Sequence, residues 1–202
     1  MKARKGKSSA DEFSHTLKIP ADRVGVLIGT SGSMKKHIER ATNTQISVDS
    51  KEGEVTITSD DGINLYDARE VIHAIARGFN PEVAMRLLKG EYSLEIIDIA
   101  DYAGKSKNTA DRLRGRVIGA EGKARREIEH LTDTSIQVYG KTIAIIGEIE
   151  HVSNARHAVG NLLAGATHAA VYRFLEKKQR EYRMRKRDEE VAFSGAESYI
   201  KN

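Results

Sequence analysis

The chain has 202 residues, of which 39% are hydrophobic, 31% charged and 5% aromatic, with a formal net charge of +4. This balance indicates a globular protein of one large or two small domains rather than a disordered chain. Cys is absent, which excludes disulfide scaffolds, Cys-ligated metal sites and thiol catalysis. No apolar run reaches the ~18 residues of a membrane helix, and no apolar stretch follows the basic N-terminus as it would in a secretory signal. We therefore expect a cytoplasmic protein that has no contact with a membrane.

The first half of the chain predicts a unit of alternating strands and helices. Pro20 and Asp22 mark the start of a short helix, and Ser33 is the expected N-cap of the next helix. Two segments then alternate with period two around a turn, and a longer segment carries apolar residues at helical spacing. The predicted order is strand 15–19, helix 20–28, glycine turn 29–32, helix 34–41, strands 45–49 and 54–58, and helix 65–78.

The second half repeats this pattern. Aligned without gaps, residues 25–48 and 115–138 share ten identities in 24 positions, which indicates a tandem duplication. The identities, by their first-copy numbers, are Gly25, Ile28, Gly29, Gly32, Ile38, Glu39, Thr42, Thr44, Ile46 and Val48. The predicted elements are strand 93–99, helices 109–118 and 123–131, strands 135–139 and 142–146, and a helix from about residue 152. That helix is expected to continue through residue 190, because no Pro interrupts it, and residues 101–108 form a polar insertion that the first copy lacks.

Each copy carries a glycine turn between two helices, Val26-Leu-Ile-Gly-Thr-Ser-Gly in the first and Val117-Ile-Gly-Ala-Glu-Gly in the second. Glycines let a backbone approach a ligand closely, and the N-terminus of the following helix attracts phosphate. With these motifs the chain resembles the K-homology (KH) family of RNA-binding domains. The resemblance implies an α+β fold of two tandem type I KH domains, each a three-stranded sheet packed by three helices, plus a basic C-terminal helix. The expected boundaries are a flexible tail 1–13, KH domains 14–88 and 92–166, a basic helical extension 167–190, and a flexible tail 191–202.

Two further segments resemble a narrower group. The run Arg112-Leu-Arg-Gly-Arg-Val-Ile-Gly and residues 145–163 are similar to the archaeal ribosome-assembly KH proteins of the partner-of-Nob-one (dimethylase-interacting) family. That resemblance implies a role in small-subunit assembly and rRNA processing. The implied ligand is single-stranded RNA at the 3′ end of small-subunit (16S) rRNA or its precursor. The implied partners are a Nob-type endonuclease and the alpha subunit of archaeal initiation factor two.

Charge around the turns favours the second copy as the principal RNA clamp, because phosphate contacts supply most of the sequence-independent affinity. Residues 105–126 hold eight basic and two acidic residues, against four and one in residues 23–40. Glu121 opposes this, since a carboxylate inside the turn repels phosphate. The expected RNA-binding residues are Arg112, Arg114, Arg116, Ile118, Gly119, Ala120, Glu121, Gly122, Lys123, Arg125, Arg126 and Ile136 in the second copy, and Gly29, Thr30, Ser31, Gly32, Lys35 and Lys36 in the first.

No catalytic or metal-ligating pattern stands out. The seven His residues form no HExxH spacing, and the glycine turns lack the GxxxxGK[ST] spacing of a P-loop, so we expect neither an enzyme nor a bound metal or cofactor. Two alternative functions remain open, an accessory RNA-binding subunit of an exosome-type ribonuclease and a KH-based protein-interaction scaffold. The basic segment 173–187 is either a solvated helix face with i,i+4 ion pairs or a contact for the rRNA backbone.

Overall fold

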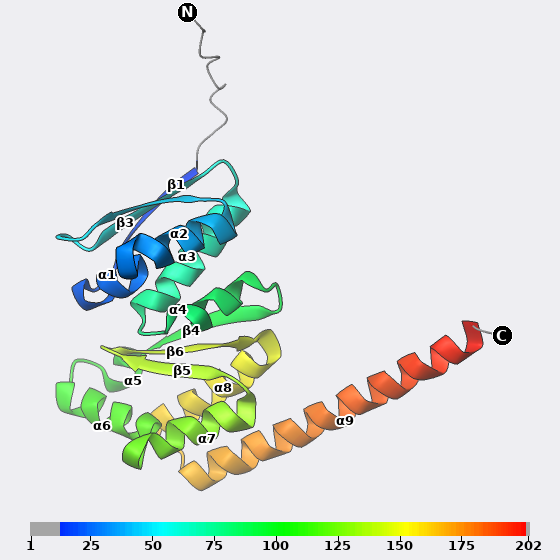
Figure 1. Ribbon diagram of the computed structural model, residues 1–202. Helices are drawn as coiled ribbons and strands as arrows, with labels where there is room; N and C mark the ends of the chain where they lie inside the picture. Colours follow the sequence, from blue (N-terminus) through cyan, green and yellow to red (C-terminus); the bar gives the residue numbers. More distant parts are fainter. Residues whose placement is uncertain (1–12, 201–202) are drawn as a thin grey trace, which may run out of the picture. The chain divides into compact units, whose positions relative to one another are not determined.

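The computed structural model describes residues 13–200, with side chains through residue 189 (Figure 1). The chain divides into two compact units between Leu94 and Glu95. The predicted N-terminal tail lies outside the described residues except for Phe13, which begins the first strand. No helix in the described part of the chain has the length and apolarity of a membrane span.

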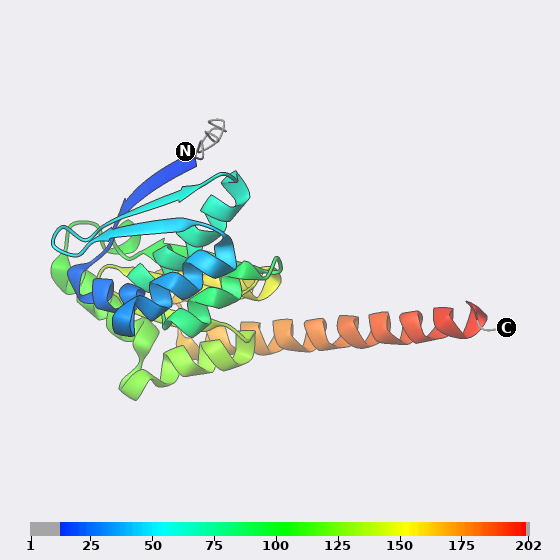
Figure 2. The same cartoon turned by 45° about the horizontal axis from the view of Figure 1, so that its top comes forward.

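Unit 1 is a three-stranded antiparallel sheet with its helices on one face (Figures 1 and 2). The strand order is β1-β3-β2, so that β3 is central, with Leu17 opposite Val55 and Ile46 opposite Ile57. The elements are β1 (Phe13–Lys18), α1 (Ala21–Ile28), a 3₁₀ turn (Thr30–Gly32), α2 (Ser33–Thr42), β2 (Gln45–Asp49), β3 (Glu54–Ser59), α3 (Gly62–Ala76), α4 (Pro81–Ala84) and a second 3₁₀ turn (Met85–Leu88).

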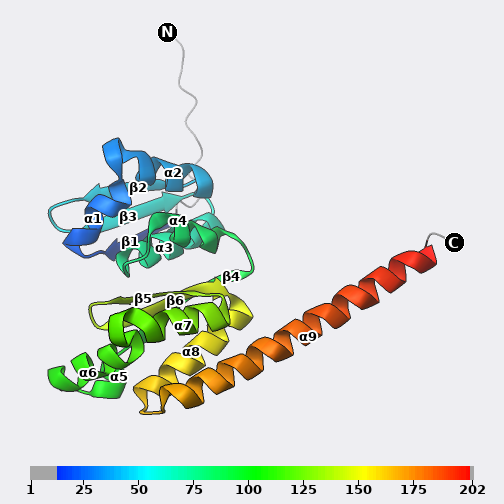
Figure 3. The same ribbon diagram turned by 60° about the horizontal axis from the view of Figure 1, so that its bottom comes forward.

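Unit 2 repeats this topology, with strand order β4-β6-β5 and helices α6, α7 and α8 on one face of the sheet (Figure 3). It adds a short helix before α6 and a long helix at the C-terminus, which starts against α7 and α8 and runs out beyond them (Figure 3). Its elements are β4 (Tyr92–Asp98), α5 (Ala100–Ala103), α6 (Lys107–Ile118), a 3₁₀ turn (Ala120–Gly122), α7 (Lys123–Thr132), β5 (Ser135–Tyr139), β6 (Thr142–Glu148), α8 (Ile149–Leu163) and α9 (His168–Ile200).

The core of each unit lies between the sheet and its third helix. In unit 1 the apolar stripe of α3 is fully buried at Ala68, Val71, Ile72 and Ile75, which confirms the helical spacing found in the sequence. In unit 2 the equivalent stripe of α8 is buried together with Val171 and Leu175 of α9. Since full burial of one such aliphatic side chain contributes roughly 1.5–3 kcal/mol, α9 is part of the fold of unit 2 over its first turns.

Half of the ten repeated identities form the passage from the second helix to the second strand. In unit 1 the hydroxyl of Thr42 donates to the carbonyl of Ile38 at 2.8 Å and lies 2.9 Å from the hydroxyl of Thr44. The carboxylate of Glu39 accepts the N–H of Ile46 at 2.9 Å. Unit 2 forms the same contacts through Ile128, Glu129, Thr132, Thr134 and Ile136. These identities therefore build the scaffold and do not face a ligand.

The structure corrects two predicted helix boundaries. Ser33 is not an N-cap: α2 begins at Ser33 itself, because Gly32 takes the left-handed conformation that ends the turn (φ +76°) and no side chain caps the helix. The helix predicted to run unbroken from residue 152 to 190 is interrupted after Leu163. Gly165 has φ +103°, and the hydroxyl of Thr167 accepts the N–H of Ala170 at 3.3 Å, which caps a new helix.

Two further helical segments differ from the sequence prediction. Helix α4, which starts at Pro81 with Asn80 as its N-cap, was not predicted. Helix α9 continues through Ile200, across most of the segment expected to be a flexible tail.

Candidate nucleic-acid interface

The two glycine turns have the same backbone conformation. In unit 2 Gly119 has φ +72° and ψ 178°, Glu121 has φ +51°, and Gly122 has φ +76°. The equivalent angles in unit 1, at Gly29, Ser31 and Gly32, differ by a few degrees at most. Each turn therefore holds one non-glycine residue in the left-handed region, which costs roughly 1–2 kcal/mol. Both units keep this conformation despite its cost, so the turn geometry is a defined part of each fold.

The two glycines of each turn are needed for different reasons. A Cβ at Gly119 would lie 2.6 Å from the Cβ and 2.8 Å from the N of Ala124, so this position has to be glycine for α7 to pack against the turn. A Cβ at Gly122 would meet only the flexible end of Arg126, at 3.3 Å. In unit 1 the first glycine abuts Met34, and Gly32 has nothing within 4 Å. The first glycine thus serves the fold, and the second leaves the outer side of the turn open.

The side chain of Arg116 faces into the fold. Its Nε donates to the carbonyl of Leu162 at 3.1 Å and its Nη2 to the carbonyl of Ala166 at 2.5 Å. In unit 1 Arg23 makes the equivalent pair of bonds, to Ile75 and Phe79. The two arginines stand at positions that do not align in the repeat, yet both hold the carbonyl end of the third helix. Arg116 is therefore a structural residue, and its inclusion among the RNA ligands is corrected.

A second basic position is also engaged within each unit. The amino group of Lys35 lies 2.8 Å from the carboxylate of Glu39 and donates to the carbonyl of Ile46 at 2.9 Å. Partial burial raises the pKa of Glu39, but the hydrogen bonds from Lys35 and the N–H of Ile46, together with the charges of Lys35 and Lys36, outweigh it and lower the pKa. Arg125 pairs in the same way with Glu129, at 3.6 Å. Lys35 thus faces the start of β2, and Arg125 is engaged by Glu129 along α7.

Four of the predicted cations stay available to an anion. Arg112, Lys123 and Arg126 in unit 2 and Lys36 in unit 1 are exposed and form no hydrogen bond or ion pair with any described residue. Lys123 and Arg126 come directly after the turn, on the first turn of α7, where the helix dipole also favours negative charge. Unit 2 therefore keeps three of its predicted cations available and unit 1 keeps one.

The remaining predicted residues divide by exposure. Thr30, Ser31, Ala120 and Glu121 are exposed at the tips of the turns. Ile118 is half-buried, so one edge of its side chain can line a groove. Ile136 is fully buried in the core of unit 2, which corrects its inclusion as a wall for bases. Arg114 pairs with Asp111 at 2.9 Å and donates to the carbonyl of Gly140 at 2.7 Å, so it tethers the β5–β6 hairpin to α6.

Two basic surfaces extend beyond the predicted contact residues, and the second belongs to the basic segment 173–187 already singled out in the sequence. One surrounds the turn of unit 1, where His37 and Arg40 of α2 line a cavity together with Thr30, Ser31 and Lys36. His37 and Arg40 stand one and four residues after Lys36 on the helix that follows the turn. Because residues four apart share a helix face, this spacing in the sequence would have predicted that Arg40 lies beside Lys36.

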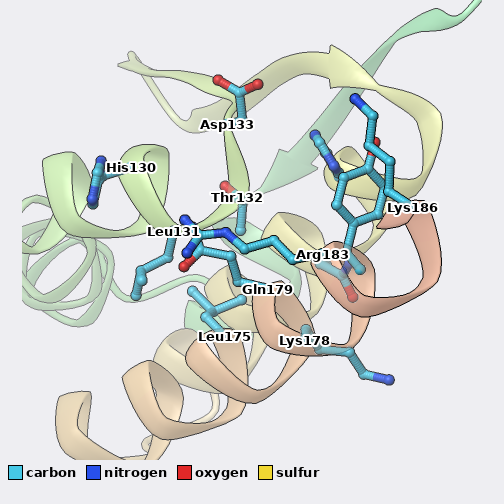
Figure 4. A pocket seen from close by; sticks show the side chains of 12 residues that line it. His130, Leu131, Thr132, Asp133, Leu175, Lys178, Gln179, Arg183 and Lys186 are labelled. Carbon is cyan, nitrogen blue, oxygen red and sulfur yellow. The ribbon is translucent and has the colours of Figure 1, made fainter. Parts of the chain in front are cut away.

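The other surface is a cavity of about 430 Å³ between α7, α8 and α9 (Figure 4). Arg183 reaches from α9 toward Leu131, whereas the amino group of Lys178 points away and pairs with Glu181 at 2.9 Å (Figure 4). Asp133 and the carbonyl end of α7 offset the positive charge here. An ion pair between Arg185 and Glu150 holds α9 against α8. The solvated-face interpretation of the basic segment is thus supported at Lys178, whereas Arg185 contacts α8, and Arg183 carries no ion pair with any described residue.

Among the described residues no three His, Asp or Glu side chains gather in a metal-binding cluster. The site is instead a pair of open, left-handed turns, each followed by a helix with exposed cations. Such a turn can take up the backbone of a nucleic-acid strand, with N–H groups and cations set against its phosphates.

Comparison with known proteins decides the family. Residues 93–180 match the eukaryotic-type KH domain (KH-domain type I), and residues 14–74 match the KH domain. A KH domain-containing protein of Methanocaldococcus jannaschii is 49% identical over 178 residues, which cover 86% of this chain and 78% of that protein. The chain belongs to the KH-domain family. The predicted fold, two type I KH domains with a C-terminal helix, is confirmed.

Two further relatives place the chain within this family. The crystal structure of an a/eIF2alpha–aDim2p–rRNA complex from Pyrococcus horikoshii contains a chain that is 42% identical, with a TM-score of 0.78; the match covers 85% of this KH protein and 96% of that chain. The pre-rRNA-processing protein PNO1 of Chaetomium thermophilum is 31% identical over 107 residues, which cover 51% of this chain and 40% of that protein. This tandem KH protein is therefore a homologue of the PNO1 and Dim2 proteins, as the narrower resemblance predicts.

Proposed function

We propose that this protein binds single-stranded rRNA, specifically the 3′ end of 16S rRNA or its precursor, and acts in the assembly and processing of the small ribosomal subunit. The observation that carries the proposal is the turn of unit 2, which is open on its outer side at Gly122 and is followed by the unpaired cations Lys123 and Arg126. KH domains use such a turn to clamp about four nucleotides by their backbone. Two homologues point the same way, one from a complex with rRNA and one named for pre-rRNA processing.

Unit 2 is the principal clamp in this proposal. It presents Arg112, Lys123 and Arg126 to an anion, whereas unit 1 presents Lys36 and Arg40. Glu121 weakens the clamp without abolishing it, because its exposed carboxylate is free to turn toward water. The contact residues proposed for RNA are Arg112, Ile118, Gly119, Ala120, Glu121, Gly122, Lys123 and Arg126, and in unit 1 Gly29, Thr30, Ser31, Gly32 and Lys36.

The test is a titration of labelled RNA that matches the 3′ end of 16S rRNA, with one carboxylate added to either turn. Ala120→Asp and Thr30→Asp stand at equivalent, exposed positions of the two turns, so they form a matched pair. We expect Ala120→Asp to weaken binding at least tenfold and Thr30→Asp to change it less than threefold, while circular dichroism stays that of the wild type. Equal losses would assign binding to both units. Wild-type affinity in both variants, or no binding by the wild type, would rule the turns out as the clamp.

The proposed protein partners are the alpha subunit of archaeal initiation factor two and a Nob-type endonuclease. The first is supported by the homologue found together with a/eIF2alpha and rRNA; the second rests on the resemblance of the sequence alone. Co-sedimentation of each purified partner with this protein, with and without the RNA, tests whether the contacts exist and whether they need RNA.

A further inference from the structure

Unit 1 contains a cavity of about 570 Å³ between the end of β1, the start of α1 and the C-terminal half of α3. Small-molecule sites are commonly of this size, roughly 300–1,000 Å³. The cavity lies at the β1 edge of the sheet, and it shares no lining residue with the cavity around the glycine turn. It is therefore a surface separate from the proposed RNA clamp of unit 1.

Positive charge exceeds negative charge around this cavity. Three permanent cations line it, Lys18, Arg69 and Arg77, and Glu52 supplies one carboxylate. Lys18 and Glu52 are exposed, and neither forms an ion pair with any described residue. Among the lining groups two positive charges are thus left uncompensated, which favours an anion with more than one negative charge.

The two arginines of the cavity have donors to spare. The Nε of Arg77 is buried and donates to none of the residues that the structure describes. Arg69 is held loosely, since its guanidinium lies 3.7 Å from the carboxylate of Glu70 and 5.8 Å from the centre of the Tyr66 ring. Because a buried donor without a partner is unfavourable, an anion in the cavity would satisfy Arg77 and would compete with Glu70 for Arg69.

His73 reports on the charge of this cavity. It stands four residues before Arg77 and lines the same cavity. Burial lowers the pKa of His73, and the positive charges of Arg77 and Arg69 lower it further. A bound anion would offset both guanidinium groups and raise this pKa again. The imidazole therefore gives a measurable signal at the site itself.

Unit 2 has the corresponding cavity without this excess of charge. Helices α3 and α8 have the same length and the same place in the repeat. The polar residues that line the cavity at the end of α3, namely Arg69, His73 and Arg77, correspond to Arg156, Gly160 and Ala164. The space at Gly160 is taken by Tyr102 of α5, whose hydroxyl would lie 3.2 Å from a Cβ there. Two of the three polar side chains are therefore absent from unit 2.

The remaining arginine of unit 2 is neutralised by a residue of its own sheet. Strands β1 and β4 end at equivalent residues, so that His15 of β1 corresponds to Glu95 of β4. The carboxylate of Glu95 lies 2.6 Å from the Nε of Arg156. Unit 1 has an imidazole at this position, so Arg69 has no carboxylate opposite it on the strand and is left for a ligand.

We infer that the cavity of unit 1 binds the phosphate group of a small molecule, with Arg69 and Arg77 as the main ligands. Guanidinium groups bind phosphate oxygens through two parallel N–H donors. A phosphate monoester carries about −1.5 to −2 charges at pH 7, which matches the two uncompensated positive charges, whereas a carboxylate neutralises only one. Inorganic pyrophosphate and a nucleoside diphosphate both carry this chemistry, and the experiment distinguishes them.

The experiment titrates pyrophosphate, ADP and citrate into the full chain by calorimetry. Arg69→Gln/Arg77→Gln removes the two main ligands, and His15→Glu gives Arg69 the carboxylate that unit 2 has at the equivalent position. The matched control, Arg40→Gln/Arg86→Gln, removes two exposed arginines of unit 1 outside the cavity. We expect both cavity variants to weaken pyrophosphate binding by at least about tenfold, because hydrogen bonds to charged groups are worth that factor or more. The control should stay within threefold of the wild type.

A second readout places the anion. In the wild type, pyrophosphate should raise the pKa of His73 in an NMR titration of the imidazole, and in His15→Glu it should not. Tighter binding of ADP than of pyrophosphate would identify a nucleotide as the ligand, and the reverse would identify the inorganic anion. If the double arginine variant failed to fold, as judged by circular dichroism, His15→Glu would still decide the question.

Four results would overturn the inference. They are the absence of binding of both phosphate compounds by the wild type, equal losses in the cavity and control variants, citrate binding as tight as that of pyrophosphate, and a His73 pKa that pyrophosphate leaves unchanged. The RNA titration of the proposed function is independent of these results. A loss of RNA affinity in the cavity variants without any binding of pyrophosphate or ADP would assign the cavity to the RNA backbone instead.

Discussion

The two glycines of the unit 2 turn should respond very differently to alanine. Gly119→Ala places a methyl group 2.6 Å from the Cβ and 2.8 Å from the N of Ala124, at φ +72° and ψ 178°. The backbone conformation alone costs roughly 1–3 kcal/mol for a residue with a Cβ, and the first turn of α7 has to move as well. We expect a loss of about 3 kcal/mol or more in the stability of unit 2.

Gly122→Ala has only the backbone cost, because its methyl group meets nothing but the mobile end of Arg126. A left-handed φ costs an alanine roughly 1–2 kcal/mol. Gly115→Ala is the matched control: it lies within α6, is exposed, and has nothing within 4 Å. Since alanine is favoured over glycine inside a helix by roughly 0.5–1 kcal/mol, that variant should be slightly more stable than the wild type.

The assay must resolve one unit from the other, because a chain of two units need not unfold in a single transition. Native-state amide exchange of buried residues in α6 and α7 gives the opening free energy of unit 2, and the amides of α3 serve as an internal control. If Gly122→Ala cost as much as Gly119→Ala, or if Gly119→Ala cost under about 1 kcal/mol, the steric reasoning would be refuted.

Three further predictions concern side chains near the turns. Arg116→Ala should lower the stability of unit 2 by roughly 2–4 kcal/mol, because it removes two charge-assisted hydrogen bonds to helix-end carbonyls. Arg112 forms no such bonds, so Arg112→Ala should leave the melting temperature unchanged and weaken RNA binding instead. Because the pKa of Glu39 is lowered in the folded protein, its carboxylate stabilises the fold at a pH above its ordinary pKa of 4.5, and this contribution is lost as the pH falls through the folded pKa. In acid titrations of stability, Glu39→Gln should therefore lose less stability than the wild type over that pH range. An identical loss in both proteins would contradict the assignment. Glu121→Ser gives the unit 2 turn the residue that stands at the equivalent position of unit 1, and it should tighten RNA binding severalfold in a filter or anisotropy assay; unchanged affinity would mean that the carboxylate never faces the phosphates.

The duplication, the order of strands and helices, and the buried stripe of α3 could all be predicted from the amino-acid pattern. These features follow from local chemistry. The alternation of apolar and polar residues, the helical spacing of apolar residues and the positions of glycines each involve only a few neighbouring residues. The second copy repeats these patterns in register. The strands at 45–49 and 135–139 coincide with β2 and β5 for this reason. The break after α8 was not predicted, because no Pro lies there; Gly165, with a positive φ, and Thr167, as a cap, end one helix and start the next.

Which cations are exposed and which are held within the fold depends on contacts between segments far apart in the chain. Arg112 and Arg116 look alike in the sequence, one helical turn apart, yet one is exposed and the other is held by the carbonyls of Leu162 and Ala166. Helical spacing tells which face of α6 a side chain lies on, but not which carbonyl from a segment about fifty residues away stands opposite. The same reason applies to Lys105, Lys107 and Lys141, which line one cavity of unit 2. Its parts come from an insertion and a hairpin that are joined in space through the contacts of Ile99 and Arg114.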